Sequence, residues 1–171
     1  MKRIGLMSDT HGFLDERVAH YFDACDEIWH AGDIGTEAVA DWLESFKPLR
    51  AVYGNIDGPA LRQRYAEDVL FSCEGLKVWM IHIGGYPGRY VPRVKKLLPK
   101  YQPDLFVCGH SHILKVMPDT RHHLLHLNPG ACGREGFHKV NTLLRFTCHE
   151  GQVRDLEVIE LGPRGAGRSL V

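Results

Sequence analysis

The chain has 171 residues, the size of a single globular domain with a substantial hydrophobic core. Lysine and arginine together number 21, and aspartate and glutamate together also number 21, so the formal net charge is zero. This balance argues against a domain that holds nucleic acid in bulk through phosphate contacts, because such binding needs a net basic field. A hydrophobic content of 44% excludes wholesale disorder.

The sequence carries no recognisable signal for secretion or for membrane insertion. Met1-Lys2-Arg3 leads into a short strand-like segment and not into the apolar stretch of a secretory signal. No run approaches the ~18 consecutive apolar residues of a transmembrane helix. The five cysteines include no C-x-x-C pair, which argues against a disulfide framework and against a thiolate zinc site. We therefore expect a cytoplasmic protein without a membrane partner.

The first third of the chain predicts alternating strands and helices. Three apolar runs have the length of buried strands, and they lie at 4–7, 27–29 and 49–53. Apolar residues recur at helical spacing from Leu14 to Cys25 and again from Val39 to Phe46, and Thr36 is placed to cap the second helix. This βαβαβ order predicts parallel strands joined by right-handed crossovers.

The rest of the chain predicts antiparallel hairpins around one more helix and one more buried strand. The expected hairpins pair 69–73 with 76–81, 113–117 with 124–127, and 142–148 with 153–159; the helix spans 91–98 and the strand 105–108. Residues 162–168 show no apolar period. We expect residues 1–161 to form one domain and residues 162–171 to form a flexible tail.

Polar side chains follow five of the predicted strands directly. These side chains are Asp9 and His11, then Asp33, Asn55 and His82, and finally His110 and His112. The segments are 22 to 28 residues apart, close to the about 30 residues of a strand, a crossover and a returning strand. In an α/β sheet, ligands bind beyond the carboxyl ends of the strands. Since histidine is the commonest metal ligand, we expect a metal site there.

Each of these segments taken alone has an ordinary structural explanation. Asp9 could belong to a turn and a helix cap, Gly32-Asp33 and Gly54-Asn55 are common turn sequences, and His82 could be a hydrogen-bonded core histidine. His110-Ser111-His112 is harder to explain so, because it places two imidazoles within three residues. Five segments at matching strand ends are a poor fit to five accidents, so a metal site is the better interpretation.

The order D-x-H, G-D, G-N, H and G-H-x-H resembles the calcineurin-like metallophosphoesterase superfamily. The chain length and Asn128-Pro129-Gly130 resemble its small, single-domain prokaryotic phosphodiesterase branch. The resemblance covers roughly Ile4 to Gly130. It implies an α/β fold, a four-layer α/β/β/α sandwich of mixed sheets, with two divalent metal ions at the strand ends.

The resemblance also implies a ligand set and a reaction. By motif position, one ion would bind Asp9, His11 and His112, the other would bind Asn55, His82 and His110, and Asp33 would bridge the two. Asp33, Asn55 and His110 are the expected catalytic residues. A hydroxide bridging the ions would attack a small phosphate ester, most of all a phosphodiester. The resemblance favours Mn, and imidazole and carboxylate ligands also suit Ni, Fe, Zn or Co.

One residue departs from the family's pattern. Many relatives carry a histidine directly after the G-N pair, where it helps to protonate the leaving group, but this chain has Ile56. An isoleucine cannot transfer a proton. We therefore expect a preference for phosphodiesters or esters with good leaving groups, with Asp57, His30 or His138 as partial substitutes for the acid.

Other interpretations stay open at this point. One alternative is a non-catalytic scaffold of the same fold, like the retromer subunit. Such a scaffold would be expected to have lost metal ligands, whereas all seven positions here keep ligand-capable side chains. A mononuclear metal-binding or sensor domain is a third possibility.

His122, His123 and His126 are expected to be solvent-exposed or locally hydrogen-bonded. The glycine-containing loop 130–138 either borders the substrate or is simply mobile. The exposed loop 86–90 is a lid, a dimer contact or neither, and as a dimer contact it would make the chain a homo-oligomer.

Overall fold

The computed structural model describes all 171 residues and contains ten strands and four helices. In chain order these are β1 (Lys2–Met7), α1 (Arg17–Phe22), β2 (Glu27–His30), α2 (Glu37–Phe46), β3 (Leu49–Ala51), α3 (Pro59–Arg64), β4 (Asp68–Cys73), β5 (Leu76–Ile81), α4 (Pro92–Tyr101), β6 (Leu105–Val107), β7 (Leu114–Asp119), β8 (Leu124–Pro129), β9 (Val140–His149) and β10 (Gln152–Pro163). None of the helices is long and apolar enough to cross a membrane.

The strands form two five-stranded sheets, with the orders β10-β9-β1-β2-β3 and β4-β5-β6-β8-β7. In the first sheet β1, β2 and β3 are parallel, as the βαβαβ order predicts, and the β9–β10 hairpin joins them antiparallel to β1. In the second sheet β5, β6 and β8 are parallel, and β4 and β7 are antiparallel edge strands. Both sheets are therefore mixed, as expected.

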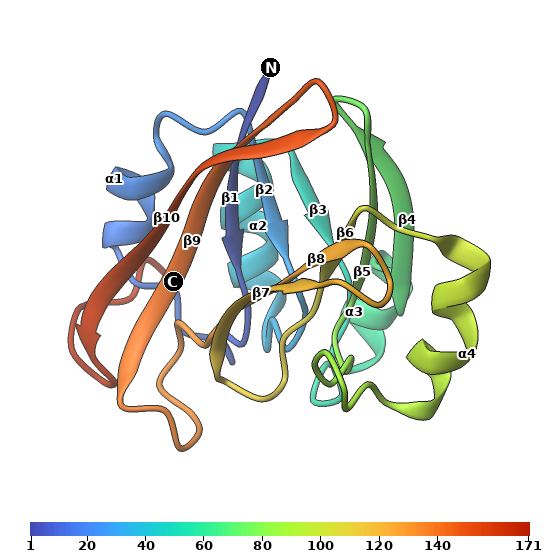
Figure 1. Cartoon of the computed structure of the whole chain (residues 1–171). Coiled ribbons are helices and arrows are strands. Elements are labelled where there is room, and N and C mark those ends of the chain that lie inside the picture. The colour runs from blue at the N-terminus through green and yellow to red at the C-terminus, as the bar shows by residue number, and fades with distance from the viewer.

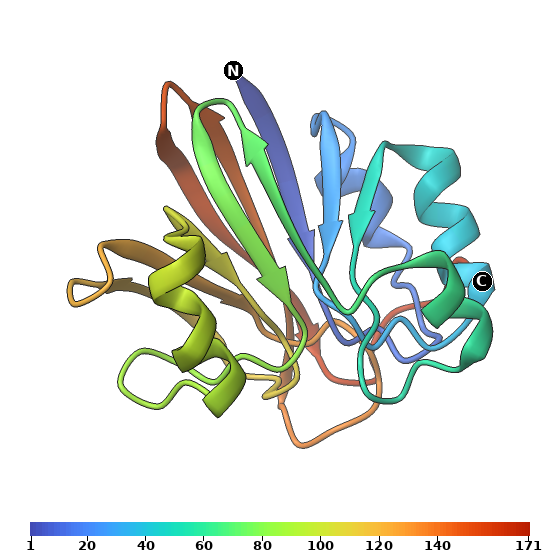
Figure 2. The ribbon, with the colours of Figure 1, turned by 90° about the vertical axis from the view of Figure 1, so that its right-hand side faces the viewer.

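The two sheets pack face to face, and the helices cover their outer faces. Ile4 and Trp29 of the first sheet pack against Val78 and Val107 of the second in a buried core between the sheets. A second core lies between the first sheet and α1 and α2, and a third lies between the second sheet and α4. Figure 2 shows α2 and α4 on opposite sides of the paired sheets. The four-layer α/β/β/α sandwich is thus confirmed.

Several local features differ from the expectations. The helix α1 has only six residues, and α3, which buries a single apolar side chain, Leu61, was not predicted at all. Thr36 stands at the N-cap of α2, but its side chain makes no capping hydrogen bond. The helix α4 begins at Pro92, where a missing backbone N–H costs nothing, and extends three residues beyond the expected end, to Tyr101.

The C-terminal segment is hydrogen-bonded to the rest of the chain, and its flexibility stays a prediction. The Leu170 N–H donates to the Leu14 carbonyl at 2.7 Å, and the Glu16 N–H donates to the Arg168 carbonyl at 2.8 Å. The Arg164 N–H donates to the Lys139 carbonyl at 2.8 Å. These partners are far away in sequence, so a local composition pattern could not reveal them.

The histidines of the β7–β8 hairpin do not share one environment. His123 is exposed and His122 is half-buried, but His126 is 1% exposed and contacts the rings of Tyr90 and Phe106. The expectation of an exposed or locally paired side chain is therefore wrong for His126, whose alternation along β8 turns it toward α4. Burial lowers the pKa of His126 to about 4.

Candidate metal centre

The carboxyl ends of five strands meet at one edge of the sandwich. The strands β1, β2 and β3 run side by side in the same direction (Figure 1), and β5 and β6 of the facing sheet end beside them. The loops that follow are tied together by main-chain hydrogen bonds: the Asp9 N–H donates to the Gly32 carbonyl at 3.0 Å, and the Gly109 N–H donates to the His82 carbonyl at 2.9 Å. All seven expected ligands lie on these loops.

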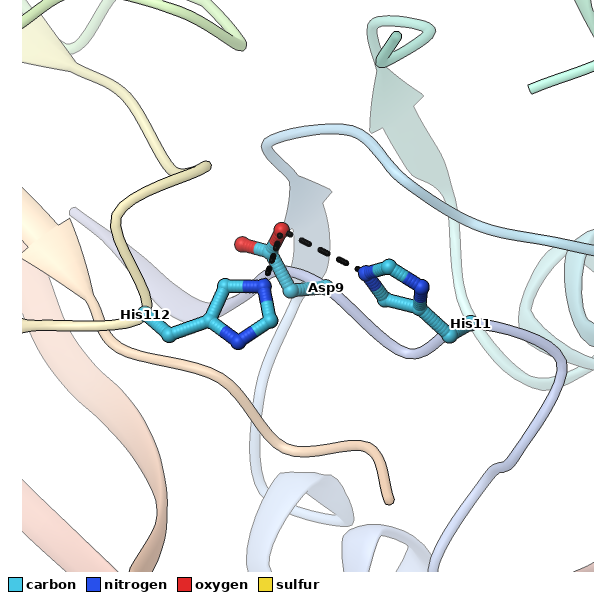
Figure 3. Close-up of side chains that lie close together, drawn as sticks. All are labelled: Asp9, His11 and His112. Atoms are coloured by element: carbon cyan, nitrogen blue, oxygen red, sulfur yellow. Dashed lines mark ion pairs between the residues drawn. The ribbon is translucent and has the colours of Figure 1, made fainter. Parts of the chain in front are cut away.

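The first group of ligand-capable side chains consists of Asp9, His11 and His112 (Figure 3). Asp9 Oδ1 lies 3.1 Å from His112 Nε2 and 3.8 Å from His11 Nε2. Asp9 Oδ1 and His11 Nε2 are buried and have no hydrogen-bond partner. Such orphaned buried atoms are costly, and a cation among them would satisfy both. The residues present therefore fit a bound metal ion.

The second group consists of Asp33, His82 and His110, with Asn55 beside it. His82 Nε2 lies 3.2 Å from Asp33 Oδ2 and 3.1 Å from Asn55 Oδ1. His82 Nδ1 lies 2.7 Å from the Ala31 carbonyl oxygen, which only accepts, so Nδ1 carries the proton in the neutral ring. The bare Nε2 then faces two oxygen atoms, an arrangement that a cation would complete.

Asp33 connects the two groups. Its Oδ2 atom lies 3.4 Å from His11 Nε2 in the first group and 3.2 Å from His82 Nε2 in the second. Its other oxygen, Oδ1, accepts a hydrogen bond from the Ile56 N–H at 3.0 Å, which fixes the carboxylate plane. One carboxylate oxygen thus contacts a histidine of each group, which is the position that a bridging ligand needs.

The electrostatics of the site favour positive charge between the carboxylates. The nearby carboxylates of Asp33 and Asp9 raise the pKa of His11 to about 9. Burial alone would raise the pKa of Asp9, but the nearby imidazoles of His11 and His112 hold that pKa well below the ordinary value. Histidine contacts likewise outweigh burial and lower the pKa of Asp33. Both carboxylates are therefore ionised and available to a cation.

The backbone at the site is strained. Five of the seven candidate ligands have a positive φ: Asp9 (56°), His11 (48°), Asp33 (54°), His110 (68°) and His112 (59°). The left-handed region costs a non-glycine residue roughly 1 kcal/mol or more, and such residues gather at functional sites. The neighbouring glycines allow close packing, since a Cβ atom on Gly54 would lie 2.0 Å from Asp33 Oδ1. These sharp turns aim the side chains at one point.

The three residues expected to substitute for the missing acid are all occupied elsewhere. Asp57 is buried and accepts hydrogen bonds from the backbone N–H groups of residues 34, 35 and 54. His30 is fully buried, with Nδ1 bound to the Gly32 N–H and Nε2 beside the Thr10 hydroxyl. Both ring nitrogens of His138 are also engaged. The expectation that one of them replaces the leaving-group acid is therefore not supported by their geometry.

The glycine-containing loop 130–138 packs directly on the first group. The Gly133 N–H donates to the Asp9 carbonyl at 3.1 Å, and a Cβ atom on Gly133 would lie 2.4 Å from the Thr10 carbonyl oxygen. Of the two alternatives for this loop, the structure favours the one near the site. Asn128 supports the facing loop, since its Nδ2 group donates to the Gly109 carbonyl at 3.0 Å and to Ser111 Oγ at 3.1 Å.

A pocket of about 320 Å³ adjoins the second group. It is lined by Asn55 and His82 on the side of the candidate ligands, and by Tyr53, Arg62, Ile83 and Arg93 among others further out. The Arg62 guanidinium lies over the Tyr53 ring, 4.6 Å from its centroid, and donates to the Asn55 carbonyl at 3.2 Å. Sequence reasoning did not identify this pocket, because its walls come from four separate segments.

Comparisons with known proteins agree with this geometry. The family model described as "Calcineurin-like phosphoesterase superfamily domain" matches residues 1–151. A "probable metallophosphoesterase" of Methanothermobacter thermautotrophicus is 29% identical over 139 residues, which cover 75% of this chain and 76% of the relative.

Two solved structures share the fold at low sequence identity. A structure described as a novel archaeal phosphodiesterase has a TM-score of 0.71 and 20% identity, covering 93% of this chain and 99% of its own. Vps29 of Chaetomium thermophilum has a TM-score of 0.73 and 15% identity, covering 96% and 100%. These likenesses concern the fold, whereas the family match concerns the sequence over most of the chain. The chain belongs to the calcineurin-like phosphoesterase superfamily.

Proposed function

We propose that the protein is a dinuclear metal-dependent phosphodiesterase. The single observation that supports this most strongly is Asp33 Oδ2, which contacts His11 of one ligand-capable group at 3.4 Å and His82 of the other at 3.2 Å. A carboxylate in this position can bridge the two ions of a two-metal phosphoesterase. The orphaned atoms Asp9 Oδ1 and His11 Nε2 support the same proposal.

The residues of the site would have different roles. Divalent ions bound there would polarise the phosphoryl group and acidify water, which supplies the nucleophile. Asp9 and Asp33 are buried, so they hold charge without contacting bulk solvent. Asn55 and His110 are exposed, so the substrate approaches from their side, and these two side chains can orient the phosphoryl oxygens. Imidazole and carboxylate donors suit Mn, our preferred ion, as well as Ni, Fe, Zn or Co.

The surroundings of the second group favour a diester over a monoester. Ile56 is 46% exposed beside Asn55 and cannot donate a proton to a departing alkoxide. An ester whose leaving group is stable as an anion does not need this proton, and we expect such esters, diesters above all, to be the better substrates. The pocket beside Asn55 and His82 offers about 320 Å³ for the second ester substituent, which a simple monoester lacks.

One experiment separates the candidate functions. Elemental analysis of the purified protein after incubation with Mn²⁺ should give two ions per chain. The same sample should hydrolyse bis(4-nitrophenyl) phosphate much faster than an alkyl phosphomonoester. Equal rates for the two esters would overturn the diester preference. A chain that binds no ion and hydrolyses neither ester would instead be a scaffold, and one ion per chain would indicate a mononuclear site.

A further inference from the structure

A row of polar side chains lies behind His112, on the side away from Asp9. His112 Nδ1 lies 3.2 Å from His138 Nδ1. His138 Nε2 lies 2.8 Å from Asn141 Oδ1 and 3.1 Å from the Gly133 carbonyl oxygen. Asn141 is fully buried, and its Nδ2 group donates to the Cys132 carbonyl at 3.2 Å. The row ends on the main chain, so its far end cannot rotate freely.

The hydrogen-bond roles in this row follow from that fixed end. The Cys132 carbonyl only accepts, so the amide nitrogen of Asn141 must face it and the amide oxygen must face His138. Both partners of His138 Nε2 are then acceptors, and Nε2 carries the single proton of the neutral ring. His138 Nδ1 is left as an acceptor, so the proton between the two rings belongs to His112 Nδ1.

The consequence falls on the other nitrogen of His112. With its proton on Nδ1, the neutral ring presents a bare Nε2, and this atom is the one that lies 3.1 Å from Asp9 Oδ1. A ring nitrogen binds a metal ion only through such a lone pair. A ring turned to the opposite tautomer would place an N–H where the ion must bind.

The loop that contains Gly136 packs against the rings of His112 and His138 and holds them in place. Gly136 has a φ of +120°, and a Cβ atom there would lie 2.1 Å from His112 Nδ1 and 3.2 Å from His138 Nδ1. The loop can therefore lie against both rings only with glycine at this position. The Arg164 guanidinium donates to the Gly136 carbonyl from the other side, so the C-terminal segment also supports the loop.

We infer that His138, oriented by Asn141, is a positioning residue that holds His112 with Nε2 unprotonated toward the ion of the first group. This inference rests on the metal centre of the proposed function. The second group has a different arrangement, because the Ala31 carbonyl orients His82 directly. Loss of the His138 ring should therefore weaken one ion site and leave the other unchanged.

The test uses the full-length chain and Mn²⁺ alone, with both sites followed by isothermal titration calorimetry. In His138→Ala, one of the two sites should weaken about 10- to 100-fold, the usual effect of losing the partner of a ligating histidine. In His138→Gln, the side-chain oxygen can accept the His112 N–H, so the affinity should return to within a few-fold of wild type. His123→Ala, which removes an exposed histidine outside the row, is the matched control.

A second measurement reads the tautomer itself in the wild-type protein. In the Zn²⁺-loaded chain, nitrogen–proton correlation spectra of the histidine rings should show His112 protonated at Nδ1 and His138 at Nε2. The opposite tautomer of His138 in the wild-type spectrum would overturn the inference, and this measurement does not depend on how any variant folds. Equal weakening of both sites in a His138→Ala chain that keeps the wild-type fold would also overturn it. A wild-type chain that binds no ion would overturn the proposed function first, and wild-type titration shows this before any variant is made.

Discussion

The two groups of candidate ligands are held in different ways, although Asp33 contacts a histidine of each. In the second group the supports are main-chain atoms: the Ala31 carbonyl orients His82, and the Ile56 N–H orients Asp33. In the first group the support of His112 is a row of side chains on a separate loop, through His138 and Asn141. Main-chain supports survive most substitutions, whereas a side-chain row can be interrupted at any member. The first group is therefore the one that a substitution outside the ligands themselves can weaken selectively.

The largest expected effect comes from Asp33, which contacts a histidine of each group. Asp33→Ala should lose both ions, measured as metal per chain, and should lower diester hydrolysis by at least about 10³-fold, since bound ions contribute several kcal/mol to the reaction. His110→Ala should lose nearly as much activity while the first group still binds its ion. Retained activity in Asp33→Ala would contradict the bridging role and would make the two groups independent.

The next largest effect is expected from Gly136→Ala, which should weaken ion binding at the first group only. Gly136→Ala places a methyl group where His112 Nδ1 now lies, so His112 must move away from Asp9. We expect one ion to bind about 10- to 100-fold more weakly in calorimetric titrations, with the other unchanged. Gly58→Ala is the control, because nothing lies within 4 Å of a Cβ atom there. Equal weakening of both ions would show that the groups share their support.

Stability of the metal-free protein should depend on buried histidines outside both groups. Burial lowers the pKa of His126 to about 4, below its ordinary value near 6.5. The unfolded chain therefore binds this proton first, so His126 contributes nothing above pH 6.5 and destabilises the fold as pH falls from 6.5 toward 4. The cost is up to about 1.4 kcal/mol per pH unit.

Urea unfolding with a chelator present, at several pH values, measures this loss. His126→Phe keeps an aromatic ring beside Phe106 but cannot take up the proton, so its stability should fall less steeply than that of wild type over the same range. Parallel curves for the two proteins would show that His126 titrates normally in the folded chain.

The smallest effect concerns the C-terminal segment. Arg164→Ala removes the hydrogen bond to the Gly136 carbonyl from the exposed side of the loop. One exposed hydrogen bond is worth about 1 kcal/mol or less, so the first-group ion should bind roughly twofold to fivefold more weakly. Arg154→Ala is the control, because it removes an exposed arginine of β10, the strand that Arg164 directly follows. This variant should bind both ions as wild type does. A tenfold or larger loss in Arg164→Ala would make the C-terminal segment part of the site proper.

The parts of the fold that the sequence could predict are those written in local patterns. Parallel β1, β2 and β3 follow from apolar runs joined by amphipathic helices, and Asp9, Asp33 and His82 reach one edge because each follows a strand directly. The helix α3 has one buried apolar residue, too few for a periodic signal. The docking of Leu170 on Leu14 is a main-chain contact between distant segments, which no spacing rule contains.

The candidate site also contains residues that the sequence could predict and residues whose roles it could not. The side chains that face the proposed ions are recognisable from residue type and strand-end position. The roles of His138, Asn141 and Asp57 depend on which nitrogen or oxygen meets which backbone group, and this is known only once the loops have packed. His30 and Asp57 looked suited to proton transfer because they are near the motifs in sequence, yet burial and backbone hydrogen bonds take them out of reach.

The left-handed backbone conformation that places the candidate ligands also lowers the stability of the fold; it occurs at Asp9, His11, Asp33, His110 and His112. Each of these residues carries torsional strain that a glycine at the same position would not carry. At His110, which is exposed, glycine would relieve that strain at little other cost and should raise the melting temperature while abolishing a ligand, whereas alanine would lose the ligand and keep the strain. Selection for thermostability alone would therefore favour variants that have lost a metal ligand and with it the activity.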